Sequence, residues 1–132
     1  MAVDSPWIAF APADANREYL ALLSYLPLRK YRTIPRFLRF SFQIHKQLRG
    51  TPGAIAYSLR AKLISRNFWT LSVWNDEKAL MDFVVKVPHG EVMKTLIPHM
   101  GPTKFTKWKV AGSALPLRWE DAMQRSHQGA RT

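Results

Sequence analysis

One stretch, residues 67–89, constrains the fold of this chain more than any other. It opens with the aromatic and β-branched run Phe68–Trp74, which is typical of a strand covered on both faces. Asn75 or Asp76 can then cap a helix, and acidic residues in the first helical turn suit the positive end of the helix dipole. The helical pattern breaks at Pro88. A strand that leads directly into a helix is therefore the centre of the predicted fold.

The rest of the chain supplies further segments of both kinds, at residues 19–28, 53–64 and 104–110 for strands and at 33–49, 89–97 and 117–126 for helices. Alternation is clearest over residues 53–64, where apolar residues recur at every second position. The order strand, helix, strand, strand, helix, strand predicts an α+β ferredoxin-like βαββαβ sandwich with a four-stranded antiparallel sheet. Residues 1–17 are expected to form an N-terminal arm, 18–126 the domain with its short C-terminal helix, and 127–132 a disordered tail.

The predicted helix over 33–49 carries two polar residues on its apolar stripe. Thr33 can cap this helix, and Gly50 ends it. Ser41 and His45 lie one turn apart among the apolar residues that face the sheet. They are either a small residue at a close contact and a hydrogen-bonded core histidine, or polar groups of a pocket between the helix and the sheet. The sequence leaves both interpretations open.

Charge is the second constraint, because the chain carries a net charge of +11 with 20 basic and 9 acidic residues. No acidic residue occurs between Glu18 and Asp76. The resulting basic patch is either a solvated surface or a site for phosphate backbones, anionic membranes or acidic ligands; its members are Arg29, Arg32, Arg36, Arg39 and Lys46. A ferredoxin-like RNA-binding domain would carry a Lys/Arg-Gly-Phe-Gly-Phe motif, which this chain lacks, so nucleic acid is not the expected partner.

Composition excludes several other classes of protein. There is no cysteine, which excludes disulfides, thiolate catalysis and cysteine metal sites. No glycine-rich phosphate loop and no paired metal-ligand motif is present, so no metal site is predicted. The longest apolar run, Tyr19–Leu28, is too short to span a bilayer, and the N-terminal residues lack the basic start of a signal peptide. We therefore expect a cytoplasmic protein.

One face of the predicted sheet has no obvious cover. Both helices of a ferredoxin-like fold lie on the same face, and the opposite face would carry tryptophan and aliphatic side chains. Apart from the short arm and tail, no segment is left to cover it. A second copy of the chain, packed sheet against sheet, would bury this surface, so we predict a homodimer.

Several motifs resemble the dimeric α/β-barrel superfamily, in particular a bacterial branch related to the antibiotic-biosynthesis monooxygenases. The matching residues are Leu71-Ser72-Val73-Trp74, Phe83-Val84, His89 and the closing segment from Trp108 to Pro116. A similar strand-to-helix-to-histidine run occurs in spheroidene monooxygenases. The resemblance covers roughly residues 53–123. It implies a homodimer that closes an α/β barrel and a pocket for a small apolar or aromatic ligand.

The resemblance also suggests a monooxygenase-like site, with the candidate ligand-binding residues His89, Trp74, His45, Ser41 and Phe83. Haem is one candidate cofactor, because a neutral imidazole is a common iron ligand. The haem-degrading members would place a Trp at Phe83 and a His at Met93, and this chain has neither. A cofactor-independent oxygenase is the second option. The alternatives are a nonenzymatic dimeric binding or stress-associated module, and nucleic-acid binding through the basic patch. The sequence leaves open whether the protein is an enzyme.

Overall fold

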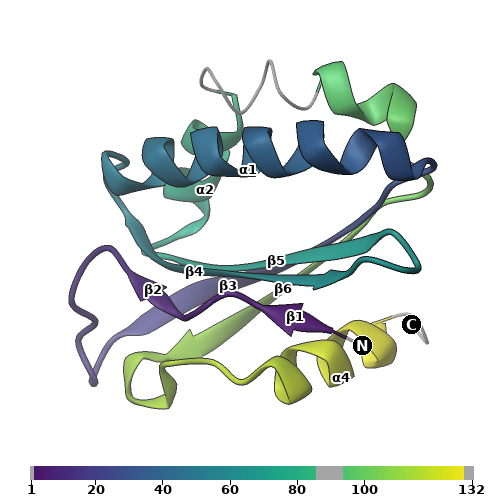
Figure 1. The fold of residues 1–132 in the computed structure, drawn as a ribbon. Helices are drawn as coiled ribbons and strands as arrows, with labels where there is room; N and C mark the ends of the chain where they lie inside the picture. The colour runs from purple at the N-terminus through teal and green to yellow at the C-terminus, as the bar shows by residue number, and fades with distance from the viewer. Residues whose placement is uncertain (1, 86–93, 130–132) are drawn as a thin grey trace.

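The fold comes from a computed structural model, which describes residues 2–85 and 94–129. Its centre is a sheet in which β4 (Ala54–Lys62), β5 (Asn67–Trp74), β3 (Glu18–Pro27) and β6 (Lys104–Ala111) lie side by side in that order. All neighbouring strands are antiparallel. Two helices, α1 (Ile34–Arg49) and α2 (Glu77–Val84), lie over one face of this sheet (Figure 1). The predicted α+β ferredoxin-like fold is confirmed.

The sheet is larger than the four strands predicted. Two short strands, β1 (Val3–Asp4) and β2 (Ile8–Ala9), pair with the outer edge of β4. The N-terminal residues therefore form part of the sheet, where they satisfy backbone N–H and C=O groups that an open edge would leave unpaired. Pro6 and Pro12 interrupt this segment, which explains why alternation did not reveal its strands.

On the first face, α1 begins and ends close to its predicted positions, and α2 begins where predicted. The predicted helix break at Pro88 lies outside the described residues. Thr33 precedes α1, but its side chain makes no capping hydrogen bond, and a 3-10 turn, η1 (Tyr31–Thr33), leads into the helix instead. Asp76 does cap α2, since its Oδ1 accepts a hydrogen bond from the Ala79 amide at 2.9 Å. The helix predicted over 89–97 lies partly outside the described residues. Residues 94–96 are helical and continue into η2 (Ile97–His99).

Gly53 sets how closely α2 approaches the start of β4. Its φ of +88° is in the region that favours glycine, and a Cβ at this position would lie 2.5 Å from the Cβ of Ala79. The Gly53 carbonyl also accepts a hydrogen bond from the Asn75 amide at 2.8 Å. The turn before β4 and the turn before α2 are thus packed directly on each other.

The second face of the sheet is covered by the chain itself. After β6, a turn at η3 (Gly112–Ala114) leads to α4 (Trp119–Gly129), which lies across the face opposite α1 (Figure 1). Trp119 and Ala122 of α4 are buried in one cluster with Leu23 and Leu71, and Met123 packs against them. The expectation that this face lacks a cover is wrong, and α4 extends three residues beyond its predicted end at Ser126. An uncovered sheet face therefore no longer supports the homodimer, which stays a prediction.

Arg60 connects the elements that cover this second face. Its guanidinium makes two hydrogen bonds to Asp4 of β1, from Nε to Oδ1 at 2.7 Å and from Nη2 to Oδ2 at 2.9 Å. The same group lies over the ring of Trp119, 4.9 Å from its centroid. Trp119 Nε1 in turn donates to Ser58 Oγ at 3.2 Å. The N-terminal strand, β4 and α4 are thereby linked through one side chain.

No helix in the described part of the chain is long and apolar enough to cross a lipid bilayer.

Candidate functional site

A pocket of about 410 Å³ lies between α1 and α2 on one side and the sheet on the other. It is lined by residues of β3, β4, β5, both helices, the segment around Met100 and β6. Its volume is at the lower end of the range of about 300–1,000 Å³ that is usual for small-molecule sites. The lining is mainly apolar, with Leu22, Leu26, Phe37 and Ile44 among its members.

The pocket exists because the central strands place small hydroxyl residues on this face. Side chains alternate between the two faces of a strand. On β3, Ser24 points to the pocket while its neighbour Leu23 is buried on the opposite face. On β5, Thr70 and Ser72 line the pocket while Leu71 packs under α4. Short side chains at the middle of the sheet leave space beneath α1 that larger residues would fill.

Three of the five predicted site residues line this pocket together. Trp74 is buried, and its Nε1 donates a hydrogen bond to Ser72 Oγ at 2.9 Å. The ring of Phe83 lies 5.1 Å from the ring of Trp74, so an aromatic pair forms one wall. Ser41 faces them from α1, and its hydroxyl donates to the Phe37 carbonyl at 3.0 Å. The structure thus brings Ser41, Trp74 and Phe83 together around one pocket.

His45 lies beside the pocket and does not line it. Its ring packs edge-on against Phe10 at 5.5 Å and against Tyr57 at 6.2 Å, centroid to centroid. Burial, and secondly the positive charge of Arg49, lower the pKa of His45 below its ordinary 6.5. The imidazole is therefore neutral near pH 7 and serves as an aromatic packing group between the N-terminal segment and β4.

Tyr57 is the residue that the sequence did not reveal. It lies on β4 between His45 and the pocket, and 7% of its surface is exposed. Burial raises the pKa of the Tyr57 phenol, which keeps it protonated and able to donate. The only available signal was a tyrosine at an inward-facing strand position, and such tyrosines are common in ordinary cores.

Charge is confined to the rim of the pocket. Lys107 of β6 contributes the one charged side chain of the described lining, and its Nζ lies 2.6 Å from Glu77 Oε1 of α2. Phe105, two residues earlier on β6, is 56% exposed. The interior thus offers hydroxyl groups and aromatic faces, and the rim offers an ion pair.

The described lining of the pocket does not fit haem. His89 lies outside the described residues, and His45 turns its ring to Phe10 and Tyr57, so the described lining offers no imidazole to iron. In residues 2–85 and 94–129, no group of three potential metal-ligating side chains gathers at one place. The site residues that the structure brings together favour recognition of an organic ligand.

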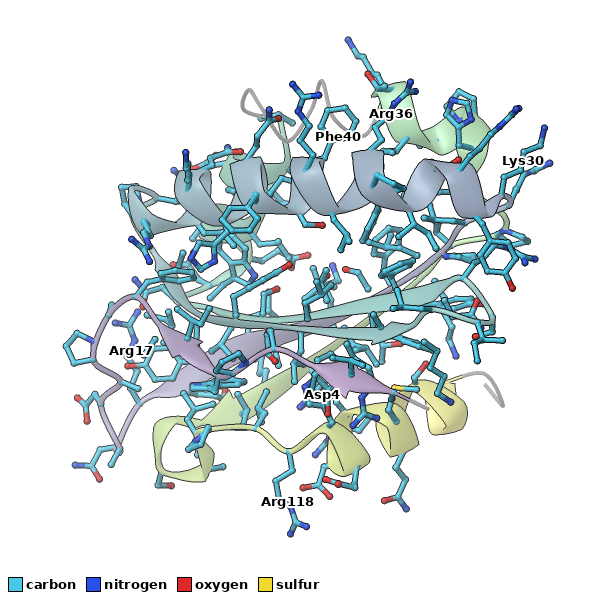
Figure 2. All side chains as sticks on the ribbon, viewed as in Figure 1. Asp4, Arg17, Lys30, Arg36, Phe40 and Arg118 are labelled. Carbon is cyan, nitrogen blue, oxygen red and sulfur yellow. The ribbon has the colours of Figure 1, made fainter. Side chains whose placement is uncertain are left out.

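The predicted basic patch is a surface feature remote from the pocket interior. Its five members are all exposed, and they extend from the turn after β3 along α1. Figure 2 shows Arg36 on the side of α1 that faces away from the sheet, and Lys30 at the end of the molecule where α1 begins. Arg29 also has a structural contact, because its Nε donates to the Met100 carbonyl at 2.7 Å.

Comparison with solved structures identifies the fold. A cofactor-independent oxygenase, SnoaB from Streptomyces nogalater, superimposes with a TM-score of 0.60 at 13% identity, over 75% of this chain and 98% of the other. A structure described as an antibiotic biosynthesis monooxygenase gives a TM-score of 0.62 at 16% identity, over 67% and 95%. The chain has the antibiotic-biosynthesis monooxygenase fold. This confirms the predicted structural resemblance.

A further match to this fold is a "putative monooxygenase" from Lactobacillus acidophilus, with a TM-score of 0.62 at 10% identity over 76% of this chain. The present chain spans about half of that protein's length, 49%. Neither a protein-family profile nor a curated protein sequence matches the chain. At these identities the monooxygenase fold is established, and the chemistry has to be argued from the pocket.

Proposed function

We propose that this protein binds a neutral, mainly apolar aromatic molecule in the pocket between α1 and the sheet. The observation that carries the proposal is the pocket itself, about 410 Å³ in volume and lined by Trp74, Phe83 and aliphatic side chains. Aromatic and aliphatic walls favour a flat ligand with a large apolar surface. The shortage of charged side chains in the described lining disfavours anionic or cationic ligands, which would lose their hydration without an ionic partner.

The hydroxyl groups define which polar atoms the ligand should carry. Tyr57 lines the pocket, is buried and stays protonated, so its hydroxyl can donate a hydrogen bond to a ligand oxygen. Ser24 and Thr70 add short hydroxyl groups on the sheet side of the pocket. A polycyclic phenol or ketone, with its oxygens on one edge, satisfies these groups while its rings occupy the apolar part.

Cofactor-independent oxygenation is the chemistry that we propose for this site. An electron-rich substrate can reduce O₂ directly: a methylene between two aromatic rings becomes a carbonyl, one oxygen atom enters the product, and the other leaves as water. Negative charge develops on the substrate oxygen when the methylene loses a proton. A hydrogen bond from Tyr57 would stabilise that charge in a site of low dielectric. The fold shared with a cofactor-independent oxygenase supports this choice.

A direct test uses dithranol, a tricyclic dihydroxyanthrone, as the probe. We expect it to quench tryptophan fluorescence through Trp74 and to raise oxygen consumption above the uncatalysed rate. The Ser41→Leu substitution fills the pocket and should weaken binding by about tenfold or more. Gln43→Leu, on the exposed side of the same helix, is the matched control and should leave binding unchanged. Equal effects of the two substitutions would contradict binding at this pocket.

The same experiment separates the alternatives. Binding that is sensitive to Ser41→Leu, without oxygen consumption, would indicate a nonenzymatic binding module. Tyr57→Phe should reduce affinity by about threefold to tenfold if its hydroxyl contacts the ligand. Added haemin that gives a Soret shift abolished by His89→Ala would instead restore the haem hypothesis. The predicted homodimer is tested separately, by the mass in solution from light scattering.

A further inference from the structure

Three chain segments meet at the end of the molecule where α1 begins: the turn at 28–32, the β4–β5 hairpin tip at 62–66, and η2 at 97–99 (Figure 1). Hydrogen bonds hold them together. They run from Leu28 N to Arg66 O at 2.9 Å, from Arg29 N to His99 O at 2.9 Å, and from the Tyr31 hydroxyl to the Ile64 carbonyl. We call these three segments the α1-start end.

Large apolar side chains are exposed on every segment of the α1-start end. Ile64, at the hairpin tip, is 81% exposed, and the adjacent Leu63 is 45% exposed. Ile97 of η2 is 58% exposed, and Tyr31 is 54% exposed. A single exposed apolar residue needs no explanation, but a group of them at one end indicates an interaction surface.

Positive charge surrounds these apolar groups. The basic residues of the same segments are Arg29, Lys30, Arg32, Lys62 and Arg66. Within the described residues none of them forms an ion pair. The sequence from residue 19 to 75 contains no acidic side chain, so no carboxylate of the first two segments offsets this charge. Arg66 also lies over the Tyr31 ring at 4.7 Å, which holds a cation directly beside an exposed aromatic group.

We propose that the α1-start end docks on an anionic membrane surface. Basic side chains near a bilayer are attracted by acidic headgroups, while exposed aliphatic and tyrosine side chains enter the interfacial layer. Long Lys and Arg side chains can follow the apolar groups inward and keep their charges at the headgroups. Charge and apolar exposure coincide on the α1-start end, and a membrane interface matches both.

A nucleic acid matches this surface less well. Phosphates would pair with the cations, but Ile64, Leu63 and Ile97 are aliphatic and cannot stack on bases as aromatic residues do. They would stay in water, and nothing in such a complex would explain their exposure. The membrane proposal is independent of the pocket, because it uses none of the residues that line it.

The test is sedimentation of the full-length protein with lipid vesicles. One set contains phosphatidylcholine alone, and the other contains roughly two parts phosphatidylcholine to one part phosphatidylserine. We expect binding to the anionic vesicles that salt weakens, and little binding to the neutral ones. The Ile64→Ser and Leu63→Ser double variant should weaken binding by about tenfold. Both side chains are exposed, so the fold should persist, and circular dichroism verifies this.

A matched pair of charge variants separates the α1-start end from the general charge of +11. Lys30→Gln with Arg32→Gln should lower binding by about tenfold or more, whereas Lys109→Gln with Arg118→Gln removes equal charge elsewhere and should have a much smaller effect. Equal losses in the two pairs would overturn the proposal in favour of nonspecific adhesion. Absence of vesicle binding would overturn it as well, and so would unchanged binding of the Ile64→Ser and Leu63→Ser double variant. Binding of an RNA or DNA oligonucleotide in place of vesicles, lost in the Lys30 and Arg32 variant, would assign the surface to nucleic acid.

Discussion

The two faces of the central sheet are built from the same strands and have opposite character. Under α4, Leu23, Leu71 and Trp69 are buried together with Trp119. Under α1, the neighbouring positions on the same strands are Ser24, Thr70 and Ser72, and a pocket of about 410 Å³ remains. Alternation along β3 and β5 lets one sequence build a packed centre under α4 and an open space under α1 at once. The α4 side has a hollow of about 390 Å³ only farther out, between α4 and β6. The difference suggests that one face supplies stability while the other keeps space for a ligand.

The largest expected effect is on the packed face. Trp119→Ala removes a buried indole together with its hydrogen bond to Ser58 and its contact with Arg60. We expect a loss of about 3–5 kcal/mol in the free energy of unfolding, measured by urea denaturation. Phe42→Ala, at a side chain 71% exposed on α1, is the control and should change it by less than about 0.5 kcal/mol. A small effect of Trp119→Ala would mean that α4 is not part of the stable core.

The comparison between faces is sharpest at two adjacent leucines of β3. Leu23 is 1% exposed beneath α4, and Leu22 borders the pocket. Leu23→Ala should cost about 2–5 kcal/mol, because it leaves a cavity in a closely packed cluster. Leu22→Ala should cost less, about 1–2 kcal/mol, because its side chain already adjoins open space. Equal losses in chemical denaturation would show that the pocket face is packed as tightly as the other.

Acid should lower the free energy of unfolding through Asp4, which lies on the α4 side of the sheet. The hydrogen bond from Arg60 lowers the pKa of the Asp4 carboxyl below its ordinary 3.8. The stabilisation from the Asp4–Arg60 pair is therefore fully present above pH 3.8. It is lost as the pH falls through the lower pKa of Asp4 in the folded state. Asp4→Asn should cost less than about 1 kcal/mol at neutral pH, since the pair is partly exposed. Unfolding free energies that fall equally with acid in both proteins would exclude a role for this pair.

The smallest effect is expected beside the pocket, from His45. Its folded-state pKa lies below 6.5, so the unfolded chain takes up a proton first as the pH falls. His45 should leave the free energy of unfolding unchanged above pH 6.5 and lower it below that pH. This decline begins at a higher pH than the one expected from Asp4. His45→Gln should flatten this part of the stability curve. An identical decline in the variant would assign the acid sensitivity to another group.

Periodicity predicted the four central strands along the chain and the first helix well, because each of these segments has a regular apolar pattern. It also placed Phe83 and Ser41 on the apolar stripes of their helices. Their grouping with Trp74 came from the resemblance to the monooxygenases, and the sequence left open which face of the sheet lines a pocket. The two short N-terminal strands were missed, since each is only two residues long and the segment contains Pro6. The path of α4 back across the sheet was missed as well, because a short amphipathic helix does not indicate which surface it covers.

The pocket itself was only partly predictable. Its volume depends on the separation between α1 and the sheet, which no periodic pattern encodes. The hydroxyl residues at its base, such as Ser24 and Ser72, have meaning only once the register of β3 and β5 is known. Tyr57 could not be distinguished from an ordinary core tyrosine, because its place in the pocket lining depends on three-dimensional contacts alone.

The pairing of β1 and β2 with β4 has a consequence for how the protein resists aggregation. A bare edge strand can recruit the edge of another molecule and begin a fibre. One edge of this sheet is closed by the N-terminal strands. At the other, Lys104, Lys107 and Lys109 lie along β6, and lysine side chains on an edge strand disfavour pairing with another strand edge. Removal of the first nine residues should therefore promote aggregation, although the sheet beneath would keep all four of its central strands.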